Sequence, residues 1–260
     1  MTWTLRQRAM LAEMGTPLWF APEVGATVEP TLPALKPPEK SPDEPAPAVS
    51  VSADAGRTGA SRPPGVATMD WPALRAAVAE CRACSLCESR TQTIFGVGHL
   101  QADWMIVGEA PGEEEDRQGE PFVGRSGQLL DNMLRALGLS RSAGGEVADP
   151  AKQVFISNTL KCRPPGNRNP LPHELSECEP YLARQIDLVR PKIILAMGRF
   201  AVQSLLRSDE PIGKLRGRVH RFQGVPLIVT YHPAYLLRNL EDKAKAWDDL
   251  CLARITHEGV

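Results

Sequence analysis

Four short apolar segments alternate with helix-like segments along the chain after Asp70. The apolar segments are DWMIVG, QVFISN, KIILAMG and VPLIVTYH, at 103–108, 153–158, 192–198 and 225–232. Strands that alternate with helices in this way form parallel sheets with helices on both faces. The sequence therefore predicts an α/β fold, a three-layer α/β/α sandwich around a central, mostly parallel, four-stranded sheet.

The helical segments carry start and stop signals. Asp70 is a predicted N-cap for WPALRAAVAEC, and Pro72 in its first turn needs no hydrogen-bond donor. Ser126 is a predicted N-cap for the next helix, which Gly138 ends. Three more helical patterns follow: HELSECEPYLARQIDLVR, RFAVQSLL and a last helix around AWDDLCLARI. A basic segment, KLRGRVHRF, separates the last two.

The chain before Asp70 has a different composition. The whole chain has 260 residues, of which 42% are hydrophobic and 23% charged, enough for one ordinary domain with length to spare. Residues 21–69 are rich in Pro and Ala, bury little surface and are predicted to be a disordered linker. Residues 1–20 fit one short helical segment, either a frayed tail or a docking segment that binds a protein partner through 5–20. The folded domain is expected at 70–260.

Composition also limits location and partners. No apolar run is long enough to span a membrane, and no signal-peptide core is present, so we expect a cytoplasmic monomer without membrane association. Cysteines in that compartment are reduced, and regularly spaced ones favour metal binding over disulfides. The net charge of -1 carries no information about DNA, so any basic surface must be local.

Five of the six cysteines fall in two groups, Cys81, Cys84 and Cys87, and Cys162 and Cys178. Four thiolates from two loops make a closed metal site, with one cysteine surplus. Cys251, inside the last helix, is most simply a core residue. The spacing fits zinc and an iron-sulfur cluster equally.

Three polar side chains follow predicted strands. Glu109 begins the loop after the first strand, Asn158 ends the second, and His232 follows the last. Ligands of open α/β sheets bind at the carboxyl ends of the strands, where such residues meet. We therefore expect the three at one sheet edge, although Glu109 alone would also fit a solvated turn.

Four long motifs in this order resemble the family 4 uracil-DNA glycosylases, the iron-sulfur branch of that superfamily. They are CRACSLCESRTQTIFGVG, MIVGEAPGEEEDRQGEPFVGRSGQLLDNML, VFISNTLKCRPPGNRNPLPHE and VTYHPAYLLR. The resemblance spans about 70 to 254 and leaves out 1–69. It implies the uracil-DNA glycosylase fold and a base-excision repair enzyme. Such an enzyme flips uracil out of DNA, hydrolyses its N-glycosidic bond and leaves an abasic site.

The resemblance also implies a cofactor and roles for residues. A 4Fe-4S cluster is expected on the thiolates at positions 81, 84, 162 and 178, without Cys87. Glu109 is expected to position or deprotonate water and stabilise the sugar, and His232 to donate a hydrogen bond to uracil O2. Asn158 and Phe122 are expected to hold the base, with Ala110 leaving room beside it. The metal ligands so implied are Cys81, Cys84, Cys162 and Cys178.

DNA contacts are expected from two regions. The family's loop that enters the duplex matches Tyr235, Leu236, Leu237 and Arg238, an apolar wedge with a cation beside it. Phosphate contacts are expected from basic residues that would otherwise be a solvated face, namely Arg163, Arg168, Lys214, Arg216 and Arg218. Glu115 and Asp116 are expected to orient the first strand-end loop.

Other interpretations fit less well. A covalent-trapping branch of the superfamily has a basic insertion with a reactive His after PPG, whereas here GNRNP follows at once. The fifth family replaces the acid of the first motif, which this chain keeps as Glu109. An iron-sulfur DNA-binding or electron-transfer module without glycosylase activity is the alternative of another class. Such a module has no need for Asn158, Phe122 and His232 at one sheet edge.

Overall fold

The computed structural model describes residues 63–141 and 149–259, together with Glu13. The segment expected at 1–20, apart from Glu13, and most of the linker expected at 21–69 lie outside these residues. The folded domain begins before Asp70, because Val66 is 5% exposed in the core and the Met69 carbonyl accepts a hydrogen bond from Arg184. Among the described residues, no helix is both long and apolar enough to cross a membrane.

The sheet has six strands in the order β1-β3-β2-β4-β6-β5. They are β1 (Val97–Gly98), β2 (Trp104–Gly108), β3 (Val154–Asn158), β4 (Ile193–Met197), β5 (Val219–Phe222) and β6 (Val225–Thr230). The four predicted strands, β3, β2, β4 and β6, form the parallel centre, and β1 and β5 pair antiparallel at the edges.

The expectation of four strands was therefore wrong in number. Residues of β2, β3 and β4 are buried at every position, which explains their continuous apolar sequence. β5 lies within the basic segment KLRGRVHRF and alternates exposed and half-buried residues, so no apolar run marks it. β1 has only two residues.

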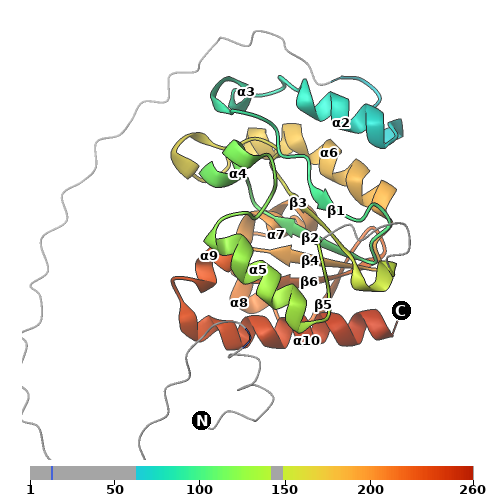
Figure 1. Ribbon diagram of the computed structural model, residues 1–260, viewed down its shortest axis with the longest axis vertical. Helices are drawn as coiled ribbons and strands as arrows, with labels where there is room; N and C mark the ends of the chain where they lie inside the picture. Colours follow the sequence, from blue (N-terminus) through green and yellow to red (C-terminus); the bar gives the residue numbers. More distant parts are fainter. Residues whose placement is uncertain (1–12, 14–62, 142–148, 260) are drawn as a thin grey trace, which may run out of the picture.

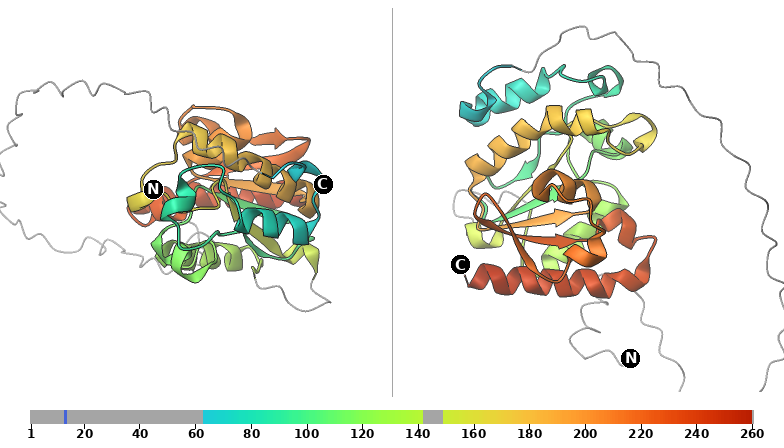
Figure 2. Two further views of the ribbon diagram at one scale, coloured as in Figure 1. Left: turned by 90° about the horizontal axis from the view of Figure 1, so that it is seen from above. Right: turned by 180° about the vertical axis from the view of Figure 1, so that it is seen from behind.

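Helices cover both faces of the sheet. They are η1 (Val66–Thr68), α2 (Trp71–Ala79), α3 (Leu86–Ser89), α4 (Glu113–Gln118), α5 (Arg125–Ala136), η2 (Pro150–Lys152), η3 (Pro165–Asn167), α6 (Pro172–Val189), α7 (Arg199–Leu206), α8 (Ile212–Leu215), α9 (Pro233–Leu236), η4 (Leu240–Asp242) and α10 (Lys243–Glu258). Side chains of α2, α6 and α7 bury one face, and side chains of α5, α9 and α10 bury the other. Figures 1 and 2 show α2 and α6 on one side and α10 on the opposite side, which confirms the three-layer sandwich.

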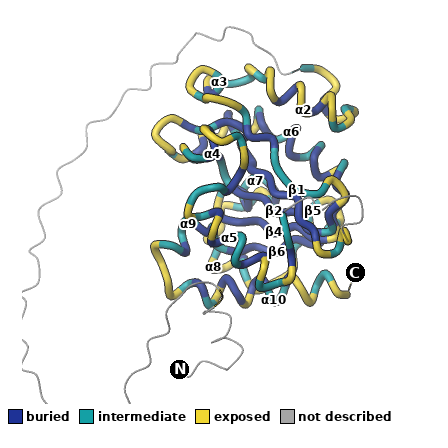
Figure 3. The backbone as a smooth tube through the Cα atoms, in the orientation of Figure 1, coloured by how far each residue is buried: buried dark blue, intermediate teal, exposed yellow. Residues whose placement is uncertain are grey.

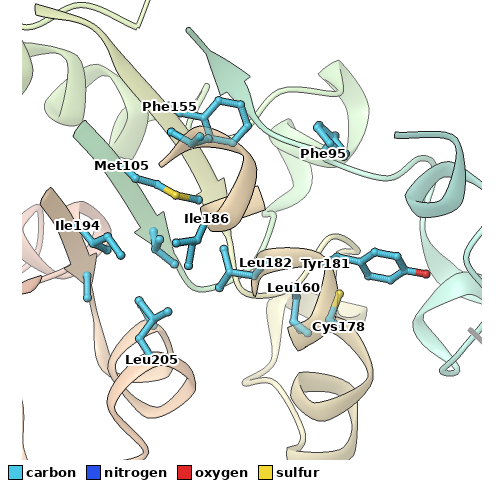
Figure 4. Packing of buried hydrophobic residues seen from close by; sticks show 14 of the residues in the cluster. Phe95, Met105, Phe155, Leu160, Cys178, Tyr181, Leu182, Ile186, Ile194 and Leu205 are labelled. Atoms are coloured by element: carbon cyan, nitrogen blue, oxygen red, sulfur yellow. The ribbon is translucent and has the colours of Figure 1, made fainter. Parts of the chain in front are cut away.

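The sheet centre and the facing sides of the helices are buried, and the exposed residues lie on the outer turns (Figure 3). On the α6 face, Ile186 lies beside Met105 of the sheet, and Tyr181 lies near Cys178 in the same apolar cluster (Figure 4). Cys178 of α6 lies in the same apolar cluster and is 8% exposed. The metal-site candidates are therefore joined to the main core.

The helix signals were partly correct. Asp70 caps α2 by accepting a hydrogen bond from Ala73 N, and Gly138 follows α5 with a φ of 75°. Ser126 does not cap α5, because the N-cap is Gly124, two residues earlier. The start of α5 is fixed by backbone packing instead, because a Cβ on Gly127 would lie 1.7 Å from the Phe122 carbonyl oxygen.

Candidate active site

A pocket of about 730 Å³ lies at the carboxyl ends of the parallel strands. Gly108 is paired with Asn158 in register, so Glu109 leaves β2 beside the end of β3. His232 comes just after β6, and α4 and α9 lie at the same end of the sheet (Figure 1). The residues predicted from strand ends and motifs that line it are Glu109, Ala110, Phe122, Asn158, Arg168, His232, Tyr235 and Arg238.

Asn158 lies at the bottom of this pocket and is 2% exposed. Its Oδ1 has no hydrogen-bond partner, although the atom is buried. A buried acceptor without a donor costs about 1–3 kcal/mol, so such an atom in a pocket favours a ligand that brings an N–H. Its main-chain oxygen is held by Lys161 Nζ at 2.7 Å.

Gly108, which has no side chain, brings the main chain of β2 close to Asn158. A Cβ built on Gly108 would lie 2.5 Å from Asn158 Oδ1 and 2.5 Å from Phe122 Cζ. Any other residue would therefore displace one of these two side chains. Gly108 therefore shapes the site, although the sequence analysis placed it only at the end of a predicted strand.

Phe122 is 4% exposed and has a φ of 56°, which is unusual for a residue with a side chain. Its ring stacks on the His232 imidazole with centroids 5.2 Å apart and planes at 26°. Glu115 supports the segment, because Oε1 accepts from Val123 N at 3.1 Å and Oε2 accepts from Gly112 N at 3.0 Å. The predicted role of Glu115 in orienting the loop is confirmed.

Asp116 and its surroundings complete that support. Its carboxylate accepts hydrogen bonds from Thr91 N at 3.0 Å and more weakly from Gln92 N. Both acids belong to α4, a helix that the sequence reading treated as a polar loop. The run of acids at its start, Glu113 to Asp116, is typical of a helix N-terminus and could have revealed it.

His232 is the N-cap of α9, and its Nδ1 accepts a hydrogen bond from Ala234 N at 3.2 Å. Because Nδ1 is the acceptor, the proton of the neutral ring resides on Nε2. Burial, assisted by the positive charge of Arg238, lowers the pKa of His232 to about 4. The ring is therefore neutral at pH 7 and can donate a hydrogen bond from Nε2.

Glu109 is half-buried, and burial raises the pKa of its carboxyl to about 7. Its main-chain oxygen accepts a hydrogen bond from Leu160 N at 3.0 Å, which joins the loop after β2 to the loop after β3. A carboxyl that titrates near neutrality suits a general base. At neutral pH the site thus combines His232, a neutral hydrogen-bond donor, with Glu109, a carboxyl group whose pKa is close to that pH.

The loop after His232 differs from expectation. Leu236 is 1% exposed and packs in the core, and Leu237 is half-buried against the same cluster. The cause is the short helix α9, which begins at Pro233. Leu236 lies three residues later and therefore faces the core on the same side of the helix as Pro233. Leu236 is therefore not a surface wedge, and Leu240, 58% exposed, is the large apolar side chain exposed nearby.

The predicted basic residues divide into two kinds. Arg216 is bound to the buried Asp249, and Arg168 forms two hydrogen bonds with the buried Glu174. Arg163 bonds Glu113 and Asn167. Exposed at the surface are Lys214, Arg218 and Arg238.

Arg199, the first residue of α7, also lines the pocket. The sequence reading missed it. Its position just after strand β4 is the same signal that marked Glu109 and His232.

The cysteines gather at a second place. A cavity between α2, α3 and α6 is lined by the four predicted ligands and by Cys87, with the cations Arg90 and Lys161 beside them. Arg90 Nη1 donates to Cys162 Sγ at 2.9 Å, and Lys161 N donates to Cys178 Sγ at 3.3 Å. Cys251 instead packs against the core on the α10 side, as predicted.

The cysteine cavity is not arranged around one point. In the described part of the chain, no group of three or more His, Cys, Asp or Glu side chains is placed to hold a single metal ion. An iron-sulfur cluster is larger than one ion, and its cysteines surround it. Sulfurs that receive N–H hydrogen bonds, with cations nearby, are the usual surroundings of such a group.

Comparison with known proteins gives one consistent result. The model of the uracil DNA glycosylase superfamily matches residues 95–251. A type-4 uracil-DNA glycosylase of Archaeoglobus fulgidus is 40% identical over 168 residues, which are 62% of this chain and 79% of the relative. A type-4 uracil-DNA glycosylase of Sulfurisphaera tokodaii is 42% identical over 175 residues, which are 64% of this chain and 75% of the relative. A type-5 uracil-DNA glycosylase of Pyrobaculum aerophilum is 33% identical over 146 residues, which are 54% of this chain and 64% of the relative.

Proposed function

Because this chain belongs to the uracil DNA glycosylase superfamily and within it to the type 4 family, we propose that it removes uracil from DNA by hydrolysis. The bond between N1 of uracil and C1′ of deoxyribose breaks, and the oxygen of a water molecule bonds to C1′. One water proton goes to the departing uracil. The products are free uracil and an abasic site, the first step of base excision repair.

The observation that carries the proposal is the unpartnered Oδ1 of Asn158. Uracil presents an N3–H donor next to the O4 acceptor, and an asparagine amide complements both with Oδ1 and Nδ2. Cytosine has an acceptor at N3 and a donor at C4, so it meets the amide with like groups. The ring of Phe122, on the pocket wall, offers the base an aromatic surface.

His232 is assigned to the leaving group. Breaking the bond puts negative charge on uracil, and a donor fixed before the reaction stabilises that charge as it develops. The neutral imidazole, with its proton on Nε2, is such a donor and needs no proton from solvent. Stacking on Phe122 fixes the plane of the ring.

Glu109 is assigned to the sugar and the water. Its carboxylate form is negative, so it favours the positive charge that develops on the sugar and can accept a proton from water. Its raised pKa, about 7, divides it between the two forms near neutrality. Ala110, the next residue in the chain, also lines the pocket, and its small side chain leaves room for the base.

DNA is held at the rim of the pocket. Arg168, Arg199, Tyr235 and Arg238 line it, and Arg163 donates a hydrogen bond to Asn167, which also lines it. We assign phosphate contacts to the arginines of this set, which makes binding salt-dependent. The reaction uses one copy of the site, and we propose a cytoplasmic monomer. Its catalytic domain begins at about Val66, earlier than the expected start at Asp70.

The cysteine cavity fits a 4Fe-4S cluster. We assign Cys81, Cys84, Cys162 and Cys178 as its ligands, because they line one cavity from two separated segments and match the ligands that the family resemblance implies. Cys87 lines the same cavity, and the resemblance alone leaves it out. Bound thiolates carry negative charge, and Arg90 and Lys161 offset it. The cluster would clamp the loop between Cys162 and Cys178 to the segment after α2. The alternative without hydrolysis gains no support, since it leaves the polar pocket around Asn158 without a task.

The test is release of uracil under single-turnover conditions from duplexes that differ only in one base, uracil or cytosine. The native chain should release uracil and not cytosine. Asn158→Asp should slow uracil release on the order of a hundredfold, because the carboxylate has lost the donor for O4. Asn132→Asp, on the outer side of α5, is the control and should act as the native chain does. Absence of uracil release by the native protein with metal bound would refute the proposal.

A further inference from the structure

Lys161 is a buried cation that the proposed chemistry does not use. It is 1% exposed, three residues after Asn158 and directly before Cys162. Its Nζ donates to Ser157 Oγ at 2.6 Å, to the Asn158 carbonyl oxygen at 2.7 Å and to Gln185 Oε1 at 2.7 Å. An ammonium group has three N–H donors, so these three acceptors satisfy it completely.

None of the three acceptors carries a charge. A buried ammonium without a negative partner is costly, and hydrophobic residues would serve packing better. The groups that would favour its charge are Cys178 and Cys162 when they bind metal as thiolates, since burial raises the pKa of both free thiols. Lys161 therefore lies beside the cysteine site, and one of its hydrogen bonds holds the main chain of Asn158, which lines the pocket.

The main chain of Lys161 makes the same connection. Its N–H donates to Cys178 Sγ at 3.3 Å. Gln185, two turns later on the same face of α6, accepts from Nζ and donates from Nε2 to the Phe95 carbonyl oxygen at 2.7 Å. One helix thus holds both ends of Lys161, and a displacement of Cys178 moves the residue that fixes the Asn158 carbonyl.

We infer that Lys161 is a positioning residue that connects the cysteine site to the reading of uracil by Asn158. Resting on the proposed function, this gives the bound metal group a second effect besides clamping a loop: it holds the Asn158 amide in the orientation that favours uracil. A purely structural lysine would affect how much protein is folded. A positioning lysine affects the preference for uracil over cytosine in the protein that is folded.

The experiment measures binding, so that it does not depend on cleavage. The probes are duplexes with a single 2′-fluoro-2′-deoxyuridine, whose glycosidic bond resists hydrolysis, or a deoxycytidine at the same position. The ratio of the two affinities is the uracil preference. Lys161→Met keeps the length and apolar stem of the side chain and removes its donors. Lys152→Met, at the exposed opposite end of β3, is the matched control.

We expect Lys161→Met to reduce the uracil preference about tenfold or more, the effect of losing a charged hydrogen bond, while Lys152→Met leaves it unchanged. Removing the metal from the native protein should reduce the preference as well. Removing it from Lys161→Met should change the preference no further, since the connection is already lost. Circular dichroism of each sample establishes that folded protein is compared.

Three results would overturn the inference: an unchanged preference in Lys161→Met, a loss of the same size in Lys152→Met, or equal effects of metal removal in the native and Lys161→Met proteins. Should Lys161→Met not fold, Ser157→Ala removes one acceptor of Nζ and takes its place, with a smaller loss expected. A native protein that neither prefers nor releases uracil refutes the proposed function itself. A native protein that does both, with unchanged variants, refutes only the role of Lys161.

Discussion

Arg141 Nη1 donates to the carbonyl oxygen of Phe122 at 3.0 Å. The same atom donates to Pro121 O at 3.0 Å, and Arg141 Nε is anchored on Asp131 Oδ1 at 2.6 Å. These bonds hold Phe122 in its left-handed backbone conformation, which costs on the order of 1–3 kcal/mol. The aromatic wall of the pocket therefore depends on a residue outside it.

Arg141→Lys should slow uracil release about tenfold to a hundredfold, because lysine cannot reproduce the fork that holds Pro121, Phe122 and Asp131. Single-turnover rates measure the effect. Arg135→Met, which changes an exposed arginine of α5, is the control. Equal rates for Arg141→Lys and the native chain, at equal folded fractions, would show that Phe122 holds its conformation without Arg141.

Glu109 predicts how the rate depends on pH. With its pKa near 7, the rate of uracil release should rise through that pH and level off above it, as the carboxylate forms. Glu109→Gln should be slower and should lose this dependence. A native rate that does not change between pH 5 and pH 8 would contradict the assignment of Glu109 as base.

Glu109 also predicts a stability change. Its folded pKa is raised, so the unfolded chain ionises first as pH rises, and the folded state loses stability from about pH 4.5 to about 7. Glu109→Gln removes this loss and should raise the Tm by a few degrees at pH 8 and by less at pH 5. Thermal unfolding at the two pH values measures it. A gain of the same size at both would mean that ionisation is not its cause.

His232→Ala should slow cleavage on the order of a hundredfold to a thousandfold, as expected for a single fixed donor, with little effect on affinity for DNA. Because the pKa of His232 is about 4, its ring should not contribute a titration to the rate between pH 5 and pH 8. His257→Ala, far along α10, should keep the native rate. If His232→Ala weakened DNA binding as much as it slowed cleavage, the donor role would be wrong.

The cysteine assignment predicts a coloured protein with iron and sulfide. Replacing any of Cys81, Cys84, Cys162 and Cys178 by Ala should reduce iron content and Tm, while Cys87→Ala should keep both. Cys251→Ala controls for loss of a half-buried thiol. A protein that holds one zinc ion and no iron would contradict the cluster, and loss of iron in Cys87→Ala would change the ligand set.

Glu109, Asn158 and His232 share one property, which is their place at a strand end, whereas Phe122 was predicted from the motif that contains it. Gly108 and Asn158 are partners in register, and the topology of parallel strands brings Glu109 and His232 to the same edge. Periodicity and strand position depend on neighbours in the chain, so they can be read from it. The cysteine groups were visible for the same reason.

Two features were missed because they depend on how the chain folds and not on a pattern in its sequence. Arg141 holds Phe122 across α5, and Leu236 turns inward because a short helix forms after Pro233. No local pattern distinguishes such an arginine from a surface residue or such a leucine from a wedge. The edge strand β5 was missed because half of its residues face solvent, so its composition resembles a loop.

Gly108 limits how this pocket can be altered. Its main chain, in the middle of the sheet, touches both Asn158 and Phe122, so the depth of the pocket is set by the backbone of β2. Side chains on the wall, such as Ala110, can be exchanged to widen or narrow the entrance. A deeper pocket for a larger base would require β2 to shift against β3 and β4. Redesign toward bulkier damaged bases therefore has to begin at the walls, and the reach of the pocket toward the sheet is fixed with the fold.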